Sequence, residues 1–161
     1  MVMSPISAIP NRNGTSRSVL SAALAIQDFA GLNQPTMTHR ITVVEDDAAF
    51  ISLLKYNLEF HKYVVECISS GSEAQVRFAS APFPDLVVLD WILPGLHGTE
   101  VLRQLRRQIL TQHIPVVMFT CRADQPDKDR AFKLGVTDFL SKTAPLATLI
   151  ARIRCLVAPF A

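Results

Sequence analysis

Four short apolar runs in the sequence each end on, or shortly before, a residue type that can handle phosphate. If these runs are parallel strands, their carboxyl ends share one edge of a sheet, so the residues that follow them converge on a small area. Carboxylates, a hydroxyl and an ammonium would then meet at that edge. The residues concerned are Glu45, Asp46 and Asp47, then Asp90, Thr120 and Lys142.

The carboxylates predict a magnesium site. Three negative charges at one edge are costly unless a cation neutralises them, and hard oxygen ligands such as Glu45, Asp46 and Asp90 suit Mg²⁺. Asp90 beside a bound cation could attack a phosphoryl group and form an acyl phosphate. Thr120 could donate its hydroxyl to a phosphoryl oxygen and Lys142 could supply positive charge, although either residue alone could simply be a strand end or a surface charge.

Strands and helices alternate five times from residue 40 onward. Runs such as Leu-Val-Val-Leu and Val-Val-Met-Phe are continuous, which is typical of strands covered by helices on both faces. The pattern predicts an α/β fold with a doubly wound, five-stranded parallel sheet. Asp47 and Ser72 are expected as helix N-caps. Gly135 is expected to stop a helix, and Ile109 to face the core. The expected strands are 41–44, 63–68, 86–89, 116–119 and 138–140, and the expected helices include 72–80, 127–134 and 145–157.

Length and composition fit one globular domain with a tail. The chain has 161 residues, of which 49% are hydrophobic and 19% charged, so it can bury a sizeable core. A formal net charge of +2 with interspersed signs gives little support for direct binding to DNA or RNA. Cys67, Cys121 and Cys155 are odd in number and unclustered, which predicts reduced, buried thiols in the cytoplasm. Without a run of about 18 apolar residues, no membrane span is expected.

Residues 1–36 differ from the rest of the chain. They contain Ser, Pro, Asn and Gly residues that resist regular structure, and 19–30 is at best one short Ala-rich helix. The segment is therefore expected to be a disordered extension. Arg12 and Arg17 before an apolar stretch leave a secretory signal or an organelle transit peptide open, and translation could also begin at Met37.

The sequence resembles the receiver domain of two-component response regulators, most closely the OmpR/PhoB-type receivers. The likeness spans residues 40–157 and is carried by three segments: Ile-Thr-Val-Val-Glu-Asp-Asp, Pro-Asp-Leu-Val-Val-Leu-Asp-Trp-Ile-Leu-Pro-Gly-Leu-His-Gly and Ile-Pro-Val-Val-Met-Phe-Thr-Cys-Arg-Ala-Asp. The resemblance implies a flavodoxin-like fold with strand order 2-1-3-4-5. It also implies a receiver domain over residues 37–161 and a cytoplasmic location. The winged-helix output domain of this subfamily is not expected within these residues, which leaves a stand-alone receiver or a truncated chain open.

The chemistry of the site follows from the same resemblance. Asp90 is implied as the phosphoacceptor, which takes a phosphoryl group from a sensor histidine kinase or a histidine phosphotransfer protein. The implied Mg²⁺ ligands are Asp46 as the main one, Glu45, Asp90 and the Ile92 backbone carbonyl. A receiver catalyses its own phosphoryl transfer and dephosphorylation, but it is not a turnover enzyme.

Signalling would follow a conformational switch. Thr120 and Lys142 are implied to bind the phosphoryl group, and Phe139 is implied as the aromatic residue that rotates into the space that Thr120 vacates. The implied readout face consists of the fourth helix, the fifth strand and the fifth helix. A downstream protein would bind this face.

The segment around Lys142 departs from the family pattern. Thr143 follows Lys142, whereas the family usually has a proline there, often after a cis bond. A cis bond before a non-proline residue costs about 2.5–4 kcal/mol, so the resemblance does not fix the conformation of this loop.

The dimer surface departs from the pattern as well. OmpR/PhoB-type receivers dimerise through charge pairs on the readout face, and Asp138 with Arg152 matches one of them. Two other expected pairs lack their acidic partner, and the meeting of two like charges in one of them would oppose the usual dimer. A weak or differently arranged homodimer is therefore expected. Lys133 stands where an acid would face Arg154, and Thr148 stands where an acid would face Lys128.

Three other interpretations stay open. A haloacid-dehalogenase-type phosphatase also uses an Asp nucleophile after a strand, but its chemistry needs Asp-x-Asp, and Ile92 occupies the second position. A flavodoxin would bind its flavin phosphate with hydroxyls and amides, whereas Glu45, Asp46 and Asp47 would repel it. The strongest alternative is a degenerate receiver that acts as a phosphorylation-independent protein-interaction module.

Overall fold

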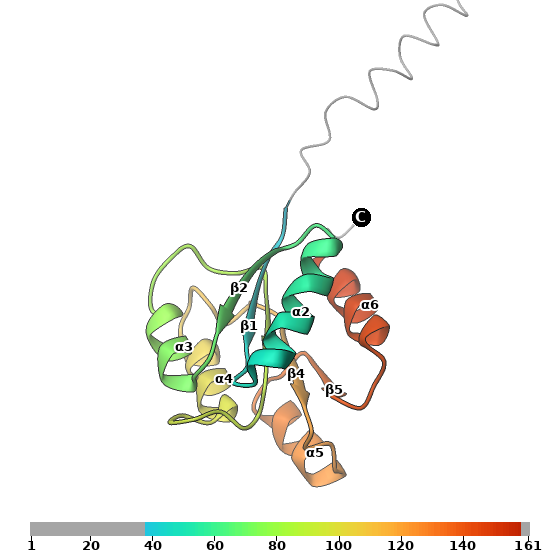
Figure 1. Cartoon of the computed structure of the whole chain (residues 1–161). Helices are drawn as coiled ribbons and strands as arrows, with labels where there is room; N and C mark the ends of the chain where they lie inside the picture. The colour runs from blue at the N-terminus through green and yellow to red at the C-terminus, as the bar shows by residue number, and fades with distance from the viewer. Residues whose placement is uncertain (1–37, 159–161) are drawn as a thin grey trace, which may run out of the picture. The chain divides into compact units, whose positions relative to one another are not determined.

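The computed structural model describes residues 38–158 as a five-stranded parallel sheet with helices on both faces (Figure 1). The strand order is β2-β1-β3-β4-β5, which confirms the predicted doubly wound, flavodoxin-like fold. Residues 1–37 and 159–161 lie outside the described part, and so does the predicted disordered extension over residues 1–36. Within the described part, no helix is long and apolar enough to cross a membrane.

Strands and helices alternate along the chain as expected. All strand pairs are parallel, so the five carboxyl ends lie at one edge of the sheet. The strands are β1 (Arg40–Val44), β2 (Val64–Ile68), β3 (Leu86–Leu89), β4 (Val116–Thr120) and β5 (Asp138–Ser141). The helices are α2 (Ala48–Phe60), α3 (Gly71–Arg77), α4 (Gly98–Arg107), α5 (Gln125–Lys133) and α6 (Leu146–Val157).

The helices are divided between the two faces of the sheet. α2 and α6 cover one face, and α3, α4 and α5 cover the other (Figure 1). In β3, Leu86 and Val88 belong to the core under α2 and α6, whereas Val87 and Leu89 belong to the core under the other three helices. Successive side chains of a strand point to opposite faces, so a central strand covered on both sides has no solvent-facing position. This confirms the interpretation of the continuous apolar runs.

Two helices begin earlier than the sequence predicts. α3 begins at Gly71, and Ser70 rather than Ser72 caps it by accepting a hydrogen bond from the amide three residues further on. α5 begins at Gln125 because Asp124 supplies its cap. In both cases a polar residue near the predicted start takes the capping role, and local sequence does not decide between such neighbours.

Exposure corrects predictions about individual side chains. Ile109 is 81% exposed rather than in the core, because α4 ends at Arg107 and the chain leaves the helix axis there. Cys121 and Cys155 are exposed and Cys67 is half-buried, so the prediction of buried thiols is wrong. An apolar neighbourhood in the sequence did not translate into burial for these residues.

One guanidinium joins three segments near the amino ends of β4 and β5. Gly135 ends α5 with a φ of +92°, as predicted, in a conformation that glycine adopts easily. Arg106 donates to the Gly135 carbonyl through Nε at 2.8 Å. Through Nη1 it donates to the carbonyls of Gln112 and Ile114 at 3.2 and 3.0 Å. Arg106 therefore links the end of α4 to the segment before β4 and to the turn after α5.

The N-cap of α2 gives a test of the fold. The Asp47 carboxylate accepts hydrogen bonds from the amides of Ala49 and Phe50 at 2.9 and 3.0 Å. We expect Asp47→Ala to lower the free energy of unfolding by about 1 kcal/mol, and Asp47→Asn to lower it by less than half of that, because asparagine also caps helices. Urea unfolding followed by circular dichroism measures both changes. Equal losses would show that the charge of Asp47, rather than its cap, stabilises the helix.

Candidate functional site

The residues that were predicted to converge do meet at the carboxyl edge of the sheet. β1 and β3 pair in register, so Glu45 and Asp90, the residues that follow them, emerge side by side. β4 and β5 also pair, which places Lys142 next to Thr120 at the adjacent strand ends. In open α/β sheets, ligands bind outside the carboxyl ends of the strands.

Three carboxylates form a compact oxygen cluster at this edge. Glu45, Asp46 and Asp90 each offer one oxygen, and these oxygens lie within 4.8 Å of one another. Glu45 and Asp90 are buried, whereas Asp46 is exposed to solvent. Burial raises the pKa of Glu45, and its hydrogen bonds with Lys142 and the Asp47 amide offset this effect only in part.

The oxygen cluster fits a Mg²⁺ ion. Two oxygens bound to one Mg²⁺ lie at most about 4.2 Å apart, twice the metal–oxygen distance, so only a small movement separates the cluster from a coordination sphere. The ligands are hard carboxylates, and exposure of Asp46 leaves room for the water ligands that Mg²⁺ usually retains. Ile92, whose carbonyl was predicted as a further ligand, lies two residues beyond Asp90 and is half exposed.

The ammonium of Lys142 lies between two of these carboxylates. Its Nζ is 2.5 Å from Glu45 Oε2 and 2.7 Å from Asp90 Oδ2, and its side chain is only 12% exposed. Burial alone would lower the pKa of Lys142, but the hydrogen bonds to Asp90 and Glu45 raise it above its usual value. Lys142 therefore remains charged at neutral pH and partly neutralises the cluster.

The Lys142 loop has Thr143 where the family usually has a proline, and backbone and hydroxyl hydrogen bonds fix its conformation instead. Among the residues that the structure describes, the one cis peptide bond precedes Pro82, so the bond between Lys142 and Thr143 is trans. The Lys142 amide donates to the Thr120 carbonyl at 2.9 Å. The hydroxyls of Ser141 and Thr143 lie 2.7 Å apart and form a hydrogen bond across the turn. These contacts position Lys142 without the cis bond that is common in the family.

The loop after β3 orients the Asp90 carboxylate. Its Oδ1 accepts hydrogen bonds from the amides of Trp91 at 2.6 Å and Ile92 at 3.4 Å, which leaves Oδ2 for Lys142. The Gly98 amide donates to the Trp91 carbonyl at 3.0 Å and closes the loop. A Cβ atom at Gly98 would lie 2.0 Å from the Asp90 carbonyl oxygen. Glycine is therefore needed there for close packing of the loop.

Phe50 is a site residue that the sequence did not reveal. Its helical spacing predicts only a place in the apolar stripe of α2, and it does pack against that core. Its ring also lies under the Lys142 ammonium, with 4.7 Å between Nζ and the ring centroid. A neighbouring ring, that of Phe119, lies 5.7 Å away between centroids. No motif links position 50 to position 142, so only the fold shows this contact.

Thr120 and Phe139, the predicted switch residues, are both buried. The Thr120 hydroxyl at the end of β4 accepts a hydrogen bond from the Arg122 amide at 3.3 Å. Phe139 in β5 is 8% exposed and packs in the core under α3, α4 and α5. The structure holds Phe139 in this buried conformer, and its rotation on phosphorylation stays a prediction.

The predicted readout face corresponds to α5, β5 and α6. Asp138 and Arg152, which were expected to pair between two copies of the chain, lie 3.6 Å apart within one copy. Arg130 of α5 lies over the Trp91 ring, 5.8 Å from its centre. Because Trp91 directly follows Asp90, this contact connects the candidate phosphoacceptor with the readout face.

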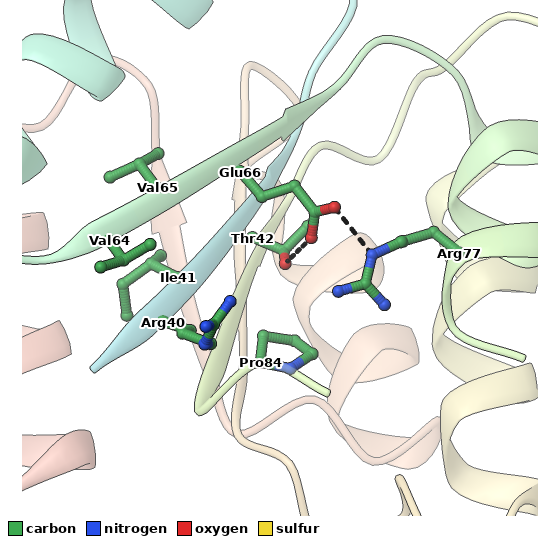
Figure 2. Close-up of a pocket in the computed structure, with 8 residues that line it drawn as sticks. All are labelled: Arg40, Ile41, Thr42, Val64, Val65, Glu66, Arg77 and Pro84. Atoms are coloured by element: carbon green, nitrogen blue, oxygen red, sulfur yellow. Dashed lines mark hydrogen bonds and ion pairs between the residues drawn. The ribbon is translucent and has the colours of Figure 1, made fainter. Parts of the chain in front are cut away.

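A second group of charged side chains lies at the amino-terminal half of β1 and β2 (Figure 2). Glu66 accepts hydrogen bonds from Arg77 Nε at 2.7 Å and from the Thr42 hydroxyl at 3.2 Å. Arg77 also donates to two carbonyls of the 80–82 loop. With Arg40, these residues line a cavity of about 240 Å³. Glu66 is paired within this cavity with Arg77 and Thr42, which indicates a structural ion pair that fixes the end of α3.

Comparisons with known proteins identify the family. The model of the response regulator receiver domain matches residues 41–154. The phosphate regulon transcriptional regulatory protein PhoB of Rhizobium meliloti (strain 1021) is 37% identical over 121 residues, which covers 75% of this chain and 53% of PhoB. The chain thus spans about half the length of the curated relatives that it matches. The resemblance to OmpR/PhoB-type receivers is confirmed.

Two solved receiver structures agree with this result. The BeF3-activated N-terminal receiver domain of Klebsiella pneumoniae RstA has a TM-score of 0.69 and 32% identity, and the match covers 74% of this chain and 99% of that one. The receiver domain of sensor histidine kinase PA1611 from Pseudomonas aeruginosa PAO1, with magnesium coordinated in its active-site cleft, has a TM-score of 0.68 and 26% identity over 74% and 97% of the two chains. The chain therefore belongs to the response regulator receiver domains of two-component systems.

Proposed function

We propose that this chain is activated when Asp90 accepts a phosphoryl group from a phosphohistidine of a sensor histidine kinase or a histidine phosphotransfer protein. The main support is the Asp90 carboxylate itself, which is held between the Trp91 amide and the Lys142 ammonium. In the transfer, an Asp90 oxygen attacks phosphorus and a P–O bond forms. The P–N bond breaks, and its electron pair leaves on the imidazole nitrogen. The product is an aspartyl phosphate.

Glu45, Asp46 and Asp90 would hold a Mg²⁺ ion, with the Ile92 carbonyl as a further ligand. When bound, the ion offsets negative charge on the phosphoryl oxygens. The oxygen cluster supports this role, and so does the magnesium ion coordinated in the PA1611 receiver. Lys142, which now contacts Asp90 and Glu45, would pair with a phosphoryl oxygen once the aspartyl phosphate forms.

Two buried residues would pass the signal on. The Thr120 hydroxyl would turn from the Arg122 amide toward the phosphoryl group, and Phe139 would exchange between two conformers as Thr120 moves. The α5–β5–α6 face would present the change to a downstream protein in the cytoplasm. The mixed surface charge, with a net value of +2, favours a protein over DNA as the direct partner.

Phosphoryl uptake by Asp90 is the direct test. Incubation with acetyl phosphate and Mg²⁺ should raise the intact mass by one phosphoryl group, and Asp90→Ala should abolish the gain because it removes the attacking oxygen. Asp85→Asn, a change just before the other end of β3, is the matched control and should leave uptake unchanged. No uptake by the wild type, or equal uptake by Asp90→Ala, would reject this function and favour a phosphorylation-independent interaction module.

Magnesium binding can be measured separately, because the single tryptophan of the chain, Trp91, directly follows Asp90. Mg²⁺ should change the fluorescence of Trp91 in a saturable titration. Asp46→Asn should weaken binding by about tenfold or more, since it removes a charged ligand. Asp47→Asn, one position away, caps α2 instead and should bind Mg²⁺ as the wild type does. Equal affinities of the two variants would contradict the role of Asp46.

The dimer surface yields a third expectation. A like-charge meeting of Lys133 and Arg154 opposes the usual α5–β5–α6 dimer, so the phosphorylated protein should form only a weak or a differently arranged dimer in small-angle X-ray scattering. Lys133→Glu should strengthen association, whereas Lys62→Glu, an equal charge change after α2, should not. A phosphorylation-dependent wild-type dimer with the usual geometry would contradict this expectation.

A further inference from the structure

Phe50 lies where its ring can act on the Lys142 ammonium, the cation of the site. It belongs to the first turn of α2, three residues after the capping Asp47, and its side chain is half-buried. One contact of its ring is with Phe119 of β4, which directly precedes Thr120. The other is with the Lys142 ammonium, 4.7 Å from the ring centroid. The Phe50 ring therefore lies between Phe119 of the core and the Lys142 ammonium of the site.

The position of the Lys142 ammonium depends on the contacts made at the tip of its side chain. A lysine side chain is long and flexible, and it loses rotamer freedom when it is held in one place. The hydrogen bonds of the loop, between Lys142 and Thr120 and between Ser141 and Thr143, restrain only the base of that side chain. At the tip, the contacts are the carboxylates of Glu45 and Asp90 and the Phe50 ring.

The ring and the carboxylates act on the ammonium in different ways. The carboxylates attract it strongly, but both are proposed ligands of Mg²⁺, which would compete for the same oxygens. The face of an aromatic ring attracts a cation through its quadrupole, and this attraction does not depend on the oxygens. The ring also excludes water from one side of the ammonium. Phe50 would thus keep Lys142 at the site after Glu45 turns to the metal.

We propose that Phe50 is a positioning residue that holds the Lys142 ammonium beside Asp90 during phosphoryl transfer. This inference rests on the proposed function of Asp90. Substitutions can separate the two roles of Phe50, packing on Phe119 and contact with Lys142. Leucine would preserve much of the packing but would offer no ring face to Lys142. Tyrosine would retain both contacts.

Three variants test the proposal. Phe50→Leu removes the ring, and Phe50→Tyr restores it. Phe60→Leu removes another phenylalanine ring of the same helix, one that is exposed and contacts His61 instead. Amide NMR spectra establish that each variant is folded. The first readout needs no phosphoryl group: the ε-methylene protons of Lys142 should be shifted upfield by the ring in the wild type, in Phe50→Tyr and in Phe60→Leu, but not in Phe50→Leu.

The second readout is the rate at which acetyl phosphate and Mg²⁺ phosphorylate Asp90. Phe50→Leu should be slower than the wild type by about 3- to 10-fold, the range expected for loss of one partly buried cation–π contact. Phe50→Tyr and Phe60→Leu should stay within about twofold of the wild type.

The outcomes distinguish this inference from the proposed function. If the wild type is phosphorylated and Phe50→Leu reacts as fast as Phe60→Leu, the role of Phe50 is wrong and the function of Asp90 stands. A Phe50→Tyr variant as slow as Phe50→Leu would also overturn it, since packing rather than the ring face would then be responsible. If the wild type takes up no phosphoryl group, the function of Asp90 fails first, and the role of Phe50 in transfer fails with it.

Discussion

The negative charge gathered at the carboxyl edge of the sheet is the constraint on which this molecule depends. Glu45 and Asp90 are buried next to each other, and an unpaired buried carboxylate strongly opposes folding. Lys142 offsets this charge from the end of β5, so the folded sheet carries its own counter-ion. The strand order that brings the two carboxylates together also delivers the ammonium. The ion pairs of Lys142 with Glu45 and Asp90 therefore stabilise the folded sheet and also form the candidate site.

Much of this arrangement could be predicted from the sequence. A run such as Leu86–Leu89, apolar at every position, has no solvent-facing side and therefore indicates a strand covered on both faces. Once the sheet is parallel, the residues after its strands must share one edge, which is how Asp90, Thr120 and Lys142 were placed together. The chemistry of the site follows from backbone periodicity and residue type, and both are properties that a sequence records directly.

The parts that were missed depend on distances between segments. Phe50 has the spacing of a core residue, and only the packing of α2 against the sheet brings its ring to Lys142. The exposure of Ile109 depends on where α4 ends, and the exposure of Cys155 on which side of α6 meets the sheet. Gly98 is required because the Asp90 carbonyl oxygen lies where a Cβ atom at position 98 would be, and the loop sequence does not show this close approach. These are consequences of three-dimensional contact rather than of local pattern.

Arg106 has a mechanical consequence for α5. Its guanidinium holds the Gly135 carbonyl, just beyond the carboxyl end of that helix, and the carbonyls that lead into β4. The amino end of α5 follows Asp124 and lies a few residues from Thr120. Because the carboxyl end of α5 is held in this way, a displacement of Thr120 of the kind proposed above would turn α5 about Gly135 rather than slide it along its axis. The amino end of α5 would then move most, and the turn at Gly135 least.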